Sequence, residues 1–204
     1  MRKLNTLISN KNLIIKTKKY TSIIGLSPSK GARSPKLWNR AFKKYGIKNE
    51  MVPFDVKNNN LSKLLNFLEH DQNYIGGCIT VPYKEKVFKW LRKNITKTSK
   101  KIGAVNCLFR GKNGKLMGTN TDGEAALKSF ENMFGKVKNK NILLLGPGGA
   151  GKAVASYFSQ SINKKKRFII LARSRKSKKF VKKIGGKWEN FKNISKMNFN
   201  EIDV

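Results

Sequence analysis

A glycine-rich turn is the part of this sequence best suited to chemistry. Gly146, Gly148 and Gly151 fit the spacing GxGxxG, between an apolar run at residues 141–145 and a helical pattern through Val154 and Phe158. In this arrangement the first glycine allows the bend, the second lets the backbone approach a pyrophosphate, and the third lets the helix lie close to the strand. Backbone N–H groups and the helix dipole can then bind phosphate. We therefore predict a dinucleotide site formed by Gly146, Gly148, Gly149, Ala150 and Gly151.

The same turn has two competing interpretations. Gly146 and the pair Gly151-Lys152 match a nucleotide-triphosphate loop at all but its last position, where Ala153 lacks the hydroxyl that binds Mg²⁺. A tight turn that binds no ligand is the simplest alternative, because a fold does not by itself imply a function. The missing hydroxyl favours the dinucleotide interpretation over the triphosphate loop.

The residues after the next apolar run indicate which dinucleotide is bound. An NAD site usually has a carboxylate about 20 residues beyond the glycine turn, where it binds a ribose hydroxyl. Here the run at 168–172 is followed by Arg173, Ser174 and several cations that include Lys176 and Lys178. Cations without a carboxylate suit a 2′-phosphate, so we predict NADP as the cofactor. Because lysine is abundant throughout the chain, the missing carboxylate supports NADP more strongly than the cations do.

Apolar runs alternate with helical patterns along the chain, which is the order typical of an α/β protein with a mainly parallel sheet. The expected strands lie at residues 22–26, 51–56, 78–81, 141–145 and 168–172. Residues 105–109 and 115–118 flank the turn-forming residues 111–114, which predicts a hairpin.

The lysine-rich stretch at residues 136–140 is the expected boundary between two domains. We expect a basic N-terminal extension at residues 1–20, a substrate-binding α/β domain at 21–135, and a Rossmann NADP-binding domain at 136–204. The Rossmann domain is expected to be incomplete, because residues 201–204 resemble the first residues of a further strand.

Composition limits the partners that the chain can have. Lys and Arg number 45 against 11 Asp and Glu, and this net charge of +34 will attract any polyanion. The cations are scattered in short clusters and no RNA-recognition or zinc-finger motif accompanies them. We therefore expect nucleic acid to bind only non-specifically, through charge.

The remaining composition predicts a cytoplasmic protein with no metal site. No run approaches the roughly 18 apolar residues of a membrane helix. Two cysteines, Cys78 and Cys107, make neither a disulfide scaffold nor a zinc site, which favours a reducing compartment. His70 is the single histidine, so acid–base chemistry would fall to Lys, Asp, Glu or Tyr. The sequence leaves the oligomeric state open, with a homodimer as one expectation.

Short motifs in a fixed order point to a known family. They are Ser34-Pro35 with Asn39, Thr80-Val81-Pro82-Tyr83-Lys84, Gly103-Ala104-Val105-Asn106, Gly118-Thr119-Asn120-Thr121-Asp122-Gly123 and Gly146-Pro147-Gly148-Gly149-Ala150. Together they resemble the shikimate dehydrogenase family over about residues 21–204. The resemblance implies an NADP-dependent oxidoreductase that interconverts 3-dehydroshikimate and shikimate in aromatic amino-acid biosynthesis, with a small-molecule substrate and no membrane partner.

The resemblance also implies roles for individual residues. Lys84 matches the family's catalytic lysine and Asp122 its partner aspartate, and together they would handle the proton that accompanies hydride transfer. Thr80 and Asn106 match positions that bind the substrate hydroxyls, and Ser34 matches one of two serines that bind the substrate carboxylate. The residues that match the clasp for the adenosine 2′-phosphate are Arg173, Ser174 and either Lys176 or Lys178.

Simpler structural roles exist for three of these residues. Lys84 could be one more solvated lysine, and Asn106 could satisfy the backbone of a turn. Thr121 and Glu124 have the T-x-x-E spacing of a capping box, so Asp122 could merely favour a helix N-terminus. The ordered set of motifs favours the site interpretation for Lys84 and Asp122.

Two departures from the family pattern leave the substrate open. Ala32 stands where the family has its first carboxylate-binding serine, although Arg33 or Ser29 could bind that anion instead. Cys78 stands where the family has an asparagine, which removes a polar contact. The alternatives are a related enzyme that acts on quinate or another cyclic hydroxy acid, and a non-catalytic nucleotide- or nucleic-acid-binding protein on the same fold.

Overall fold

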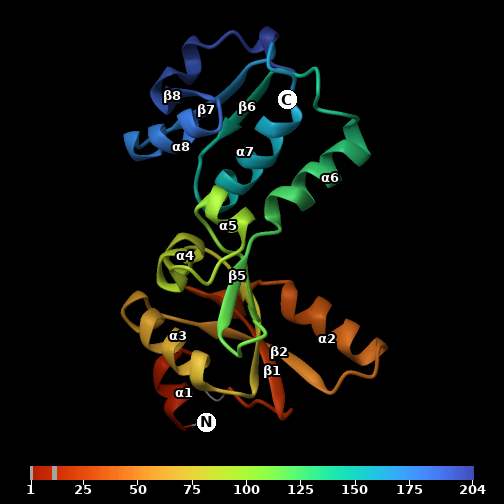
Figure 1. The fold of residues 1–204 in the computed structure, drawn as a ribbon, viewed down its shortest axis with the longest axis vertical. Coiled ribbons are helices and arrows are strands. Elements are labelled where there is room, and N and C mark those ends of the chain that lie inside the picture. Colours follow the sequence, from red (N-terminus) through yellow and green to blue (C-terminus); the bar gives the residue numbers. More distant parts are fainter. Residues whose placement is uncertain (1, 11–12) are drawn as a thin grey trace. The chain divides into compact units, whose positions relative to one another are not determined.

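The computed structural model describes residues 2–10 and 13–204, which divide into two compact units (Figure 1). The first contains the residues up to Lys100 together with 104–119, and the second contains residues 101–103 and 120–204. The division falls before α6 (Asp122–Phe134) rather than at the expected 135/136 boundary, because α6 packs along α7 (Gly149–Ser161). Their close approach depends on Gly123, where a Cβ atom would lie 2.2 Å from the carbonyl oxygen of Ala153.

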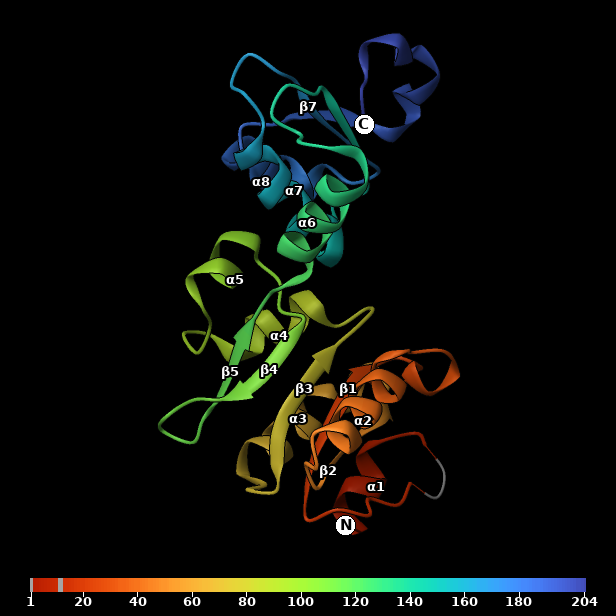
Figure 2. The same cartoon turned by 90° about the vertical axis from the view of Figure 1, so that its right-hand side faces the viewer.

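The first unit is built on a mixed sheet of five strands in the order β2-β1-β3-β4-β5. These strands are β1 (Lys19–Gly25), β2 (Asn49–Asp55), β3 (Tyr74–Ile79), β4 (Cys107–Arg110) and β5 (Leu116–Thr119). The first three pair in parallel, whereas β4 pairs antiparallel with β3 on one side and with β5 on the other, and β4 and β5 form the expected hairpin (Figure 2). The predicted α/β class is confirmed.

Helices cover both faces of this sheet. They are α1 (Arg2–Leu7), α2 (Ser34–Lys44), α3 (Leu61–His70) and α4 (Lys84–Leu91), with α5 (Lys97–Ile102) contributing residues to both units and short 3₁₀ turns at Pro28–Lys30 and Asn58–Asn60. Figure 1 shows α2 on one side of β1 and β2, and α1 and α3 on the other. The main core lies on the side of α3, where alternate strand residues such as Ile24 and Phe54 meet the fully buried Leu64 and Leu68.

The N-terminal residues are part of this core. The sequence suggested a basic extension over residues 1–20, but α1 packs against α3, and Leu4 and Ile8 are only 3% and 7% exposed. Asn10 accepts a hydrogen bond from the backbone N–H of Asp55 at 2.6 Å, which ties the segment after α1 to the end of β2. Residues 1, 11 and 12 of that extension lie outside the described part of the chain.

Arg110 joins the hairpin to the rest of the first unit. Its half-buried guanidinium donates five hydrogen bonds of 2.6–3.0 Å to backbone carbonyls, those of Leu68, Glu69, Asp71, Tyr74 and Gly114. Three of these carbonyls belong to the end of α3 or the turn after it, where a helix leaves acceptors unsatisfied. One side chain thus caps α3 and fixes the hairpin against it.

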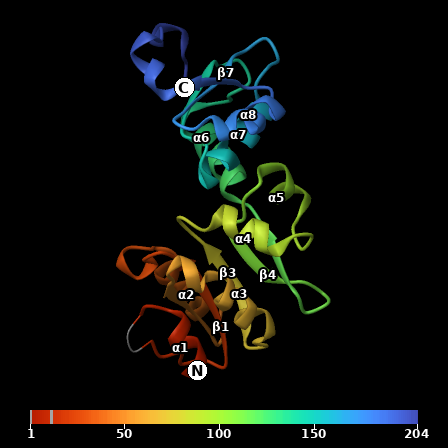
Figure 3. The ribbon, with the colours of Figure 1, turned by 90° about the vertical axis from the view of Figure 1, so that its left-hand side faces the viewer.

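The second unit contains a parallel sheet in the order β6-β7-β8, formed by β6 (Ile142–Leu145), β7 (Phe168–Ala172) and β8 (Lys187–Asn190). The helices α6, α7 and α8 (Lys178–Lys183) are grouped on one side of the strands (Figure 3). Ile142 and Ile170 of the sheet share a core with Phe158 of α7 and Val181 of α8. Three short 3₁₀ segments complete the unit, at Arg175–Ser177, Phe191–Lys196 and Phe199–Glu201.

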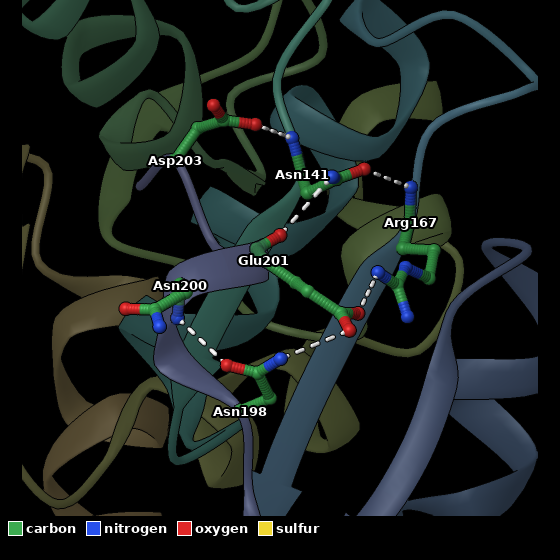
Figure 4. Close-up of polar contacts among 6 residues, drawn as sticks. All are labelled: Asn141, Arg167, Asn198, Asn200, Glu201 and Asp203. Carbon is green, nitrogen blue, oxygen red and sulfur yellow. Dashed lines mark hydrogen bonds and ion pairs between the residues drawn. The ribbon is translucent and has the colours of Figure 1, made fainter.

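Residues 201–204 lie along the edge of β6 that β7 leaves open. Val204 donates to the carbonyl of Asn141 at 3.3 Å and accepts from the N–H of Leu143 at 2.8 Å, which is the bonding pattern of a parallel strand. Asn141 holds this segment further through its backbone N–H to Asp203 (2.6 Å) and its side-chain amide to the carbonyl of Glu201 (3.1 Å). Figure 4 shows the contacts of Asn141 with Asp203 and Glu201, and the ion pair between Glu201 and Arg167. Over the residues that the structure describes, no helix has the length and apolar character to cross a bilayer.

Candidate functional site

Thr80 lies where β3 ends beside the end of β1. Its backbone N–H donates to the carbonyl of Ile24 at 2.9 Å, which extends the β1–β3 pairing by one residue. The next residue of β1 is Gly25, where a Cβ atom would lie 2.4 Å from the Thr80 methyl carbon. The half-buried Thr80 side chain therefore occupies space over β1 that only a glycine leaves free.

A short turn leads from Thr80 to Lys84. The Val81–Pro82 peptide bond is cis, and the N–H of Tyr83 returns to the carbonyl of Thr80 at 2.9 Å. The fully buried Tyr83 donates its hydroxyl proton to the carbonyl of Val56 at 2.6 Å, and burial raises the pKa of that hydroxyl. This buried bond fixes the turn, and α4 begins directly after it at Lys84.

Backbone hydrogen bonds hold Asn106 close to Thr80 and Lys84. Its carbonyl accepts from the N–H of Ile79 at 2.7 Å, and the preceding Val105 donates to the carbonyl of Lys84 at 3.0 Å. Thr80, Lys84 and Asn106, each half-buried, are therefore brought together at one end of β3 and β4. The sequence motifs predicted these three as site residues, and the fold places them next to one another.

Ser34 belongs to the segment that follows β1. It is half-buried and is the first residue of α2, with the exposed Arg33 preceding it. At the start of this segment, the backbone N–H of Leu26 donates to the carbonyl of Val81 at 3.2 Å. This bond attaches the segment to the turn that precedes Lys84. Ser29 hydrogen-bonds to the Asp55 carboxylate through its N–H (2.9 Å) and its hydroxyl. Of the two groups that could replace the serine absent at Ala32, Ser29 is thus already used by Asp55.

Asp122 starts α6 in the second unit. Its N–H donates to the side chain of the buried Asn120 at 3.1 Å. The capping box that the sequence suggested is not formed, since Thr121 makes no side-chain cap bond and Glu124 pairs with Lys128 at 2.7 Å. Lys84 and Asp122 belong to different units, and their pairing stays a prediction.

The glycine turn has the geometry that its spacing predicts. Gly146 has φ +85°, which favours glycine, and α7 begins at Gly149 with no acidic residue in its first turn. At Gly151 a Cβ atom would lie 2.1 Å from the carbonyl oxygen of Gly146, so the helix can start this close to the turn only at a glycine. At Gly148, in contrast, nothing lies within 4 Å of an added Cβ. The turn therefore leaves space at its helix N-terminus, as a pyrophosphate requires.

The cations expected at a 2′-phosphate follow β7. Arg173, Ser174 and Lys178 are all exposed. Ser174 accepts a hydrogen bond from the N–H of Lys176 at 3.2 Å and caps the 3₁₀ turn, while the Lys178 ammonium lies 4.6 Å from the ring centroid of Trp188. Trp188 comes from β8, a strand that the sequence did not predict, and it orients the cation proposed for the phosphate.

A larger hollow in the first unit lies away from these residues. It measures about 1000 Å³ and is bordered by α3, the end of α4 and the tip of the hairpin, including Glu69, Trp90 and Lys115. Its lining contains none of Ser34, Thr80, Lys84 and Asn106. The candidate site is therefore defined by the gathered strand ends and not by this hollow.

The fold and the glycine turn together define a two-unit α/β protein whose second unit is Rossmann-like. Residues 23–108 match the model of the shikimate dehydrogenase substrate binding domain. The chain is 39% identical over 167 residues to the NADP(+)-dependent shikimate dehydrogenase of Pyrococcus furiosus, covering 82% of this chain and 58% of that protein. It is 35% identical over 187 residues to the corresponding protein of Methanocaldococcus jannaschii, covering 90% and 64%. The chain belongs to the shikimate dehydrogenase family.

Solved structures agree with this assignment. A crystal structure of a shikimate dehydrogenase in complex with NADP⁺ superimposes with a TM-score of 0.77 at 29% identity, covering 96% of this chain and 68% of that one. The chain thus spans somewhat less than two thirds of the length of the curated relatives named above.

Proposed function

We propose that the protein catalyses the NADP-dependent interconversion of 3-dehydroshikimate and shikimate. The observation that carries the proposal is the gathering of Thr80, Lys84 and Asn106 at one end of the first unit's sheet, in a chain of this family. The amine, hydroxyl and amide that these three residues carry suit a polyhydroxylated substrate with one carbonyl. The reaction is part of the shikimate pathway of aromatic amino-acid biosynthesis.

Lys84 is the proposed proton donor. When bound, NADPH supplies the hydride that reduces the substrate carbonyl. As the carbonyl oxygen gains negative charge, the Lys84 ammonium donates one proton to it and so completes the hydroxyl of shikimate. Asp122 would keep Lys84 charged and oriented, because an adjacent carboxylate favours the protonated amine. In the reverse direction neutral Lys84 takes that proton back.

The other polar residues would hold the substrate. The Thr80 hydroxyl and the Asn106 amide can each donate and accept, which suits the substrate's ring hydroxyls. Ser34 would bind the carboxylate, and the neighbouring Arg33 would supply a guanidinium that can bind that anion in a bidentate manner. Arg33 is the better candidate for this role, since Ser29 is engaged by Asp55.

The second unit would hold the cofactor. The space beside Gly148 and the N-terminus of α7 would receive the pyrophosphate, with Gly146, Gly149, Ala150 and Gly151 shaping the turn. Arg173, Ser174 and Lys178 would bind the 2′-phosphate, which selects NADP over NAD. A cytoplasmic location, a homodimer and salt-sensitive, non-specific binding of nucleic acid are further parts of this proposal.

A second substrate class follows from one observation. At Ala32 the chain lacks a hydroxyl that the family uses for the substrate carboxylate, and Ser29 does not replace it freely. A changed carboxylate contact would suit quinate or a related cyclic hydroxy acid. Comparing initial rates with shikimate and quinate, both with NADP⁺, decides between the two substrates.

The test of the proposed function replaces Lys84 in the full protein. We expect Lys84→Ala to lower kcat for shikimate oxidation by about a hundredfold or more, which is the usual contribution of a general acid or base, and to leave the Kd for NADP⁺ unchanged. The matched control is Lys89→Ala, an exposed lysine of the same helix. Unchanged turnover in Lys84→Ala would remove its assigned role. Tight binding of one nucleic-acid sequence without turnover of either acid would favour a non-catalytic protein.

A further inference from the structure

The two cysteines of the chain lie directly opposite each other in the first unit's sheet. Cys78 of β3 and Cys107 of β4 are register partners in an antiparallel pair. The neighbouring bond, from the N–H of Ile79 to the carbonyl of Asn106 at 2.7 Å, places the two cysteines at a non-hydrogen-bonded position. At such positions opposite Cα atoms are about 4.5 Å apart and their side chains point to the same face.

This arrangement satisfies the geometric requirement of a disulfide. Disulfides join residues whose Cα atoms are roughly 4.4–6.8 Å apart, and a non-hydrogen-bonded antiparallel pair falls inside that range. Neither cysteine is part of a disulfide and both are half-buried, so a small reagent has partial access to them. Burial and, to a smaller extent, the nearby Cys78 raise the pKa of the Cys107 thiol to about 11.

We propose that Cys78 and Cys107 form a reversible modification site, which low-molecular-weight disulfides convert into a cross-strand disulfide. In the first step the thiolate of one cysteine attacks the small disulfide, forms a mixed disulfide and releases one small thiol. In the second step the other cysteine loses its proton and attacks the protein-side sulfur, which forms the Cys78–Cys107 bond and releases a second small thiol. The two cysteines are oxidised, and the small disulfide is reduced to two thiols.

The position of the pair links it to the candidate site. Cys78 lies two residues before Thr80, and Cys107 directly follows Asn106. A covalent bond between the strands would fix their separation and twist at the end where these two residues lie. A change in substrate binding on oxidation is therefore expected, and this consequence, unlike the disulfide itself, rests on the proposed function.

The test uses oxidised glutathione and intact-mass measurement of the folded protein. Because the sequence has only these two cysteines, every thiol product is assigned directly. We expect the wild type to lose two hydrogen atoms, to yield one peptide pair joined through Cys78 and Cys107, and to be restored by dithiothreitol. The single variants Cys78→Ser and Cys107→Ser, which keep nearly the same side-chain shape, should each retain one glutathione adduct instead.

Several outcomes would overturn the proposal. Two glutathione adducts on one wild-type chain would mean that the thiols cannot reach each other. Cross-linked dimers in place of the internal bond would mean the same. Failure of the wild type and of both variants to react while folded would show that the thiols are inaccessible. The disulfide readout needs no turnover, so a protein that forms the internal bond but does not oxidise shikimate in its reduced state would refute the proposed function and leave the thiol site standing.

Discussion

Gly25 and Thr80 are in a contact that a side chain on Gly25 would destroy. A Cβ atom at Gly25 would lie 2.4 Å from the Thr80 methyl carbon and 3.1 Å from the carbonyl oxygen of Val81. The turn from Thr80 to Lys84 therefore packs directly against the end of β1.

We expect Gly25→Ala to destabilise the protein and to impair substrate binding together. The added methyl must displace Thr80 or the backbone of Val81, and such overpacking typically costs about 1–3 kcal/mol. Urea unfolding measures the stability, and the KM for shikimate measures the effect on the site. Gly31→Ala is the matched control, since nothing lies within 4 Å of its added Cβ. Equal behaviour of the two variants would show that Thr80 is not held by this contact.

Two substitutions in the glycine turn should separate its effect on stability from its effect on cofactor binding. In Gly148→Ala the methyl enters open space, so we expect unchanged unfolding but weaker NADP⁺ binding, by about tenfold or more, because the methyl would occupy the approach of the pyrophosphate. In Gly151→Ala the methyl meets the carbonyl of Gly146, so both stability and binding should fall. Calorimetric titration with NADP⁺ and thermal unfolding measure the two effects. Unchanged affinity in Gly148→Ala would place the cofactor elsewhere.

Arg110 should be among the most sensitive positions of the first unit. In Arg110→Met the five backbone carbonyls that it serves lose their donor, and we expect a loss of about 3 kcal/mol or more in the free energy of unfolding. Arg110→Lys should recover only part of this, because an ammonium lacks the planar fork of donors. The control is Lys112→Met, an exposed residue of the hairpin turn, with an expected change within about 0.5 kcal/mol. A similar effect of the two Met variants would contradict the capping role.

The reactivity of Cys107 should depend steeply on pH. Burial is the main cause that raises the pKa of its thiol to about 11, and burial persists in Cys78→Ser. The thiolate is the reactive form, and its fraction rises about tenfold per pH unit below the pKa. Alkylation of the single thiol in Cys78→Ser by iodoacetamide should therefore keep accelerating from pH 7 to about pH 10. A plateau near pH 9 would instead show a thiol with the ordinary pKa of about 8.5.

Local patterns were sufficient to predict much of the second unit. The unbroken apolar runs mark β6 and β7, and the spacing of the glycines gives the bend at Gly146 and the helix start at Gly149. The sequence failed where packing overrides composition. Residues 136–140 look like a linker, but Val137 is fully buried in the second core. The strand β8 was missed because its four residues include one apolar side chain, Trp188.

The sequence predicts which residues form the candidate site, but it does not predict how they are arranged in space. Motif order identified Thr80, Lys84 and Asn106, yet their proximity depends on bonds such as that from Val105 to Lys84, which join residues about twenty apart. No periodicity contains that information, because the pairing of β4 with β3 creates it. The expected strand at residues 22–26 contains Gly25 without giving it a role, although a glycine inside a strand is a signal of close backbone approach.

The hydrogen bonds of Val204 to β6 place a segment of the chain at the edge of β6 that lies opposite β7. β7 lies on one side of β6 and Val204 on the other, so the order in which the chain adds segments to the sheet reverses at β6. At such a reversal in an open parallel sheet, the loops that follow the two neighbouring strands run in opposite directions and leave a crevice between them. Ligands of proteins with this architecture generally bind in that crevice. The Gly146 bend leaves the sheet at this reversal, so the topology alone would direct a ligand to the same turn that the glycine spacing singled out.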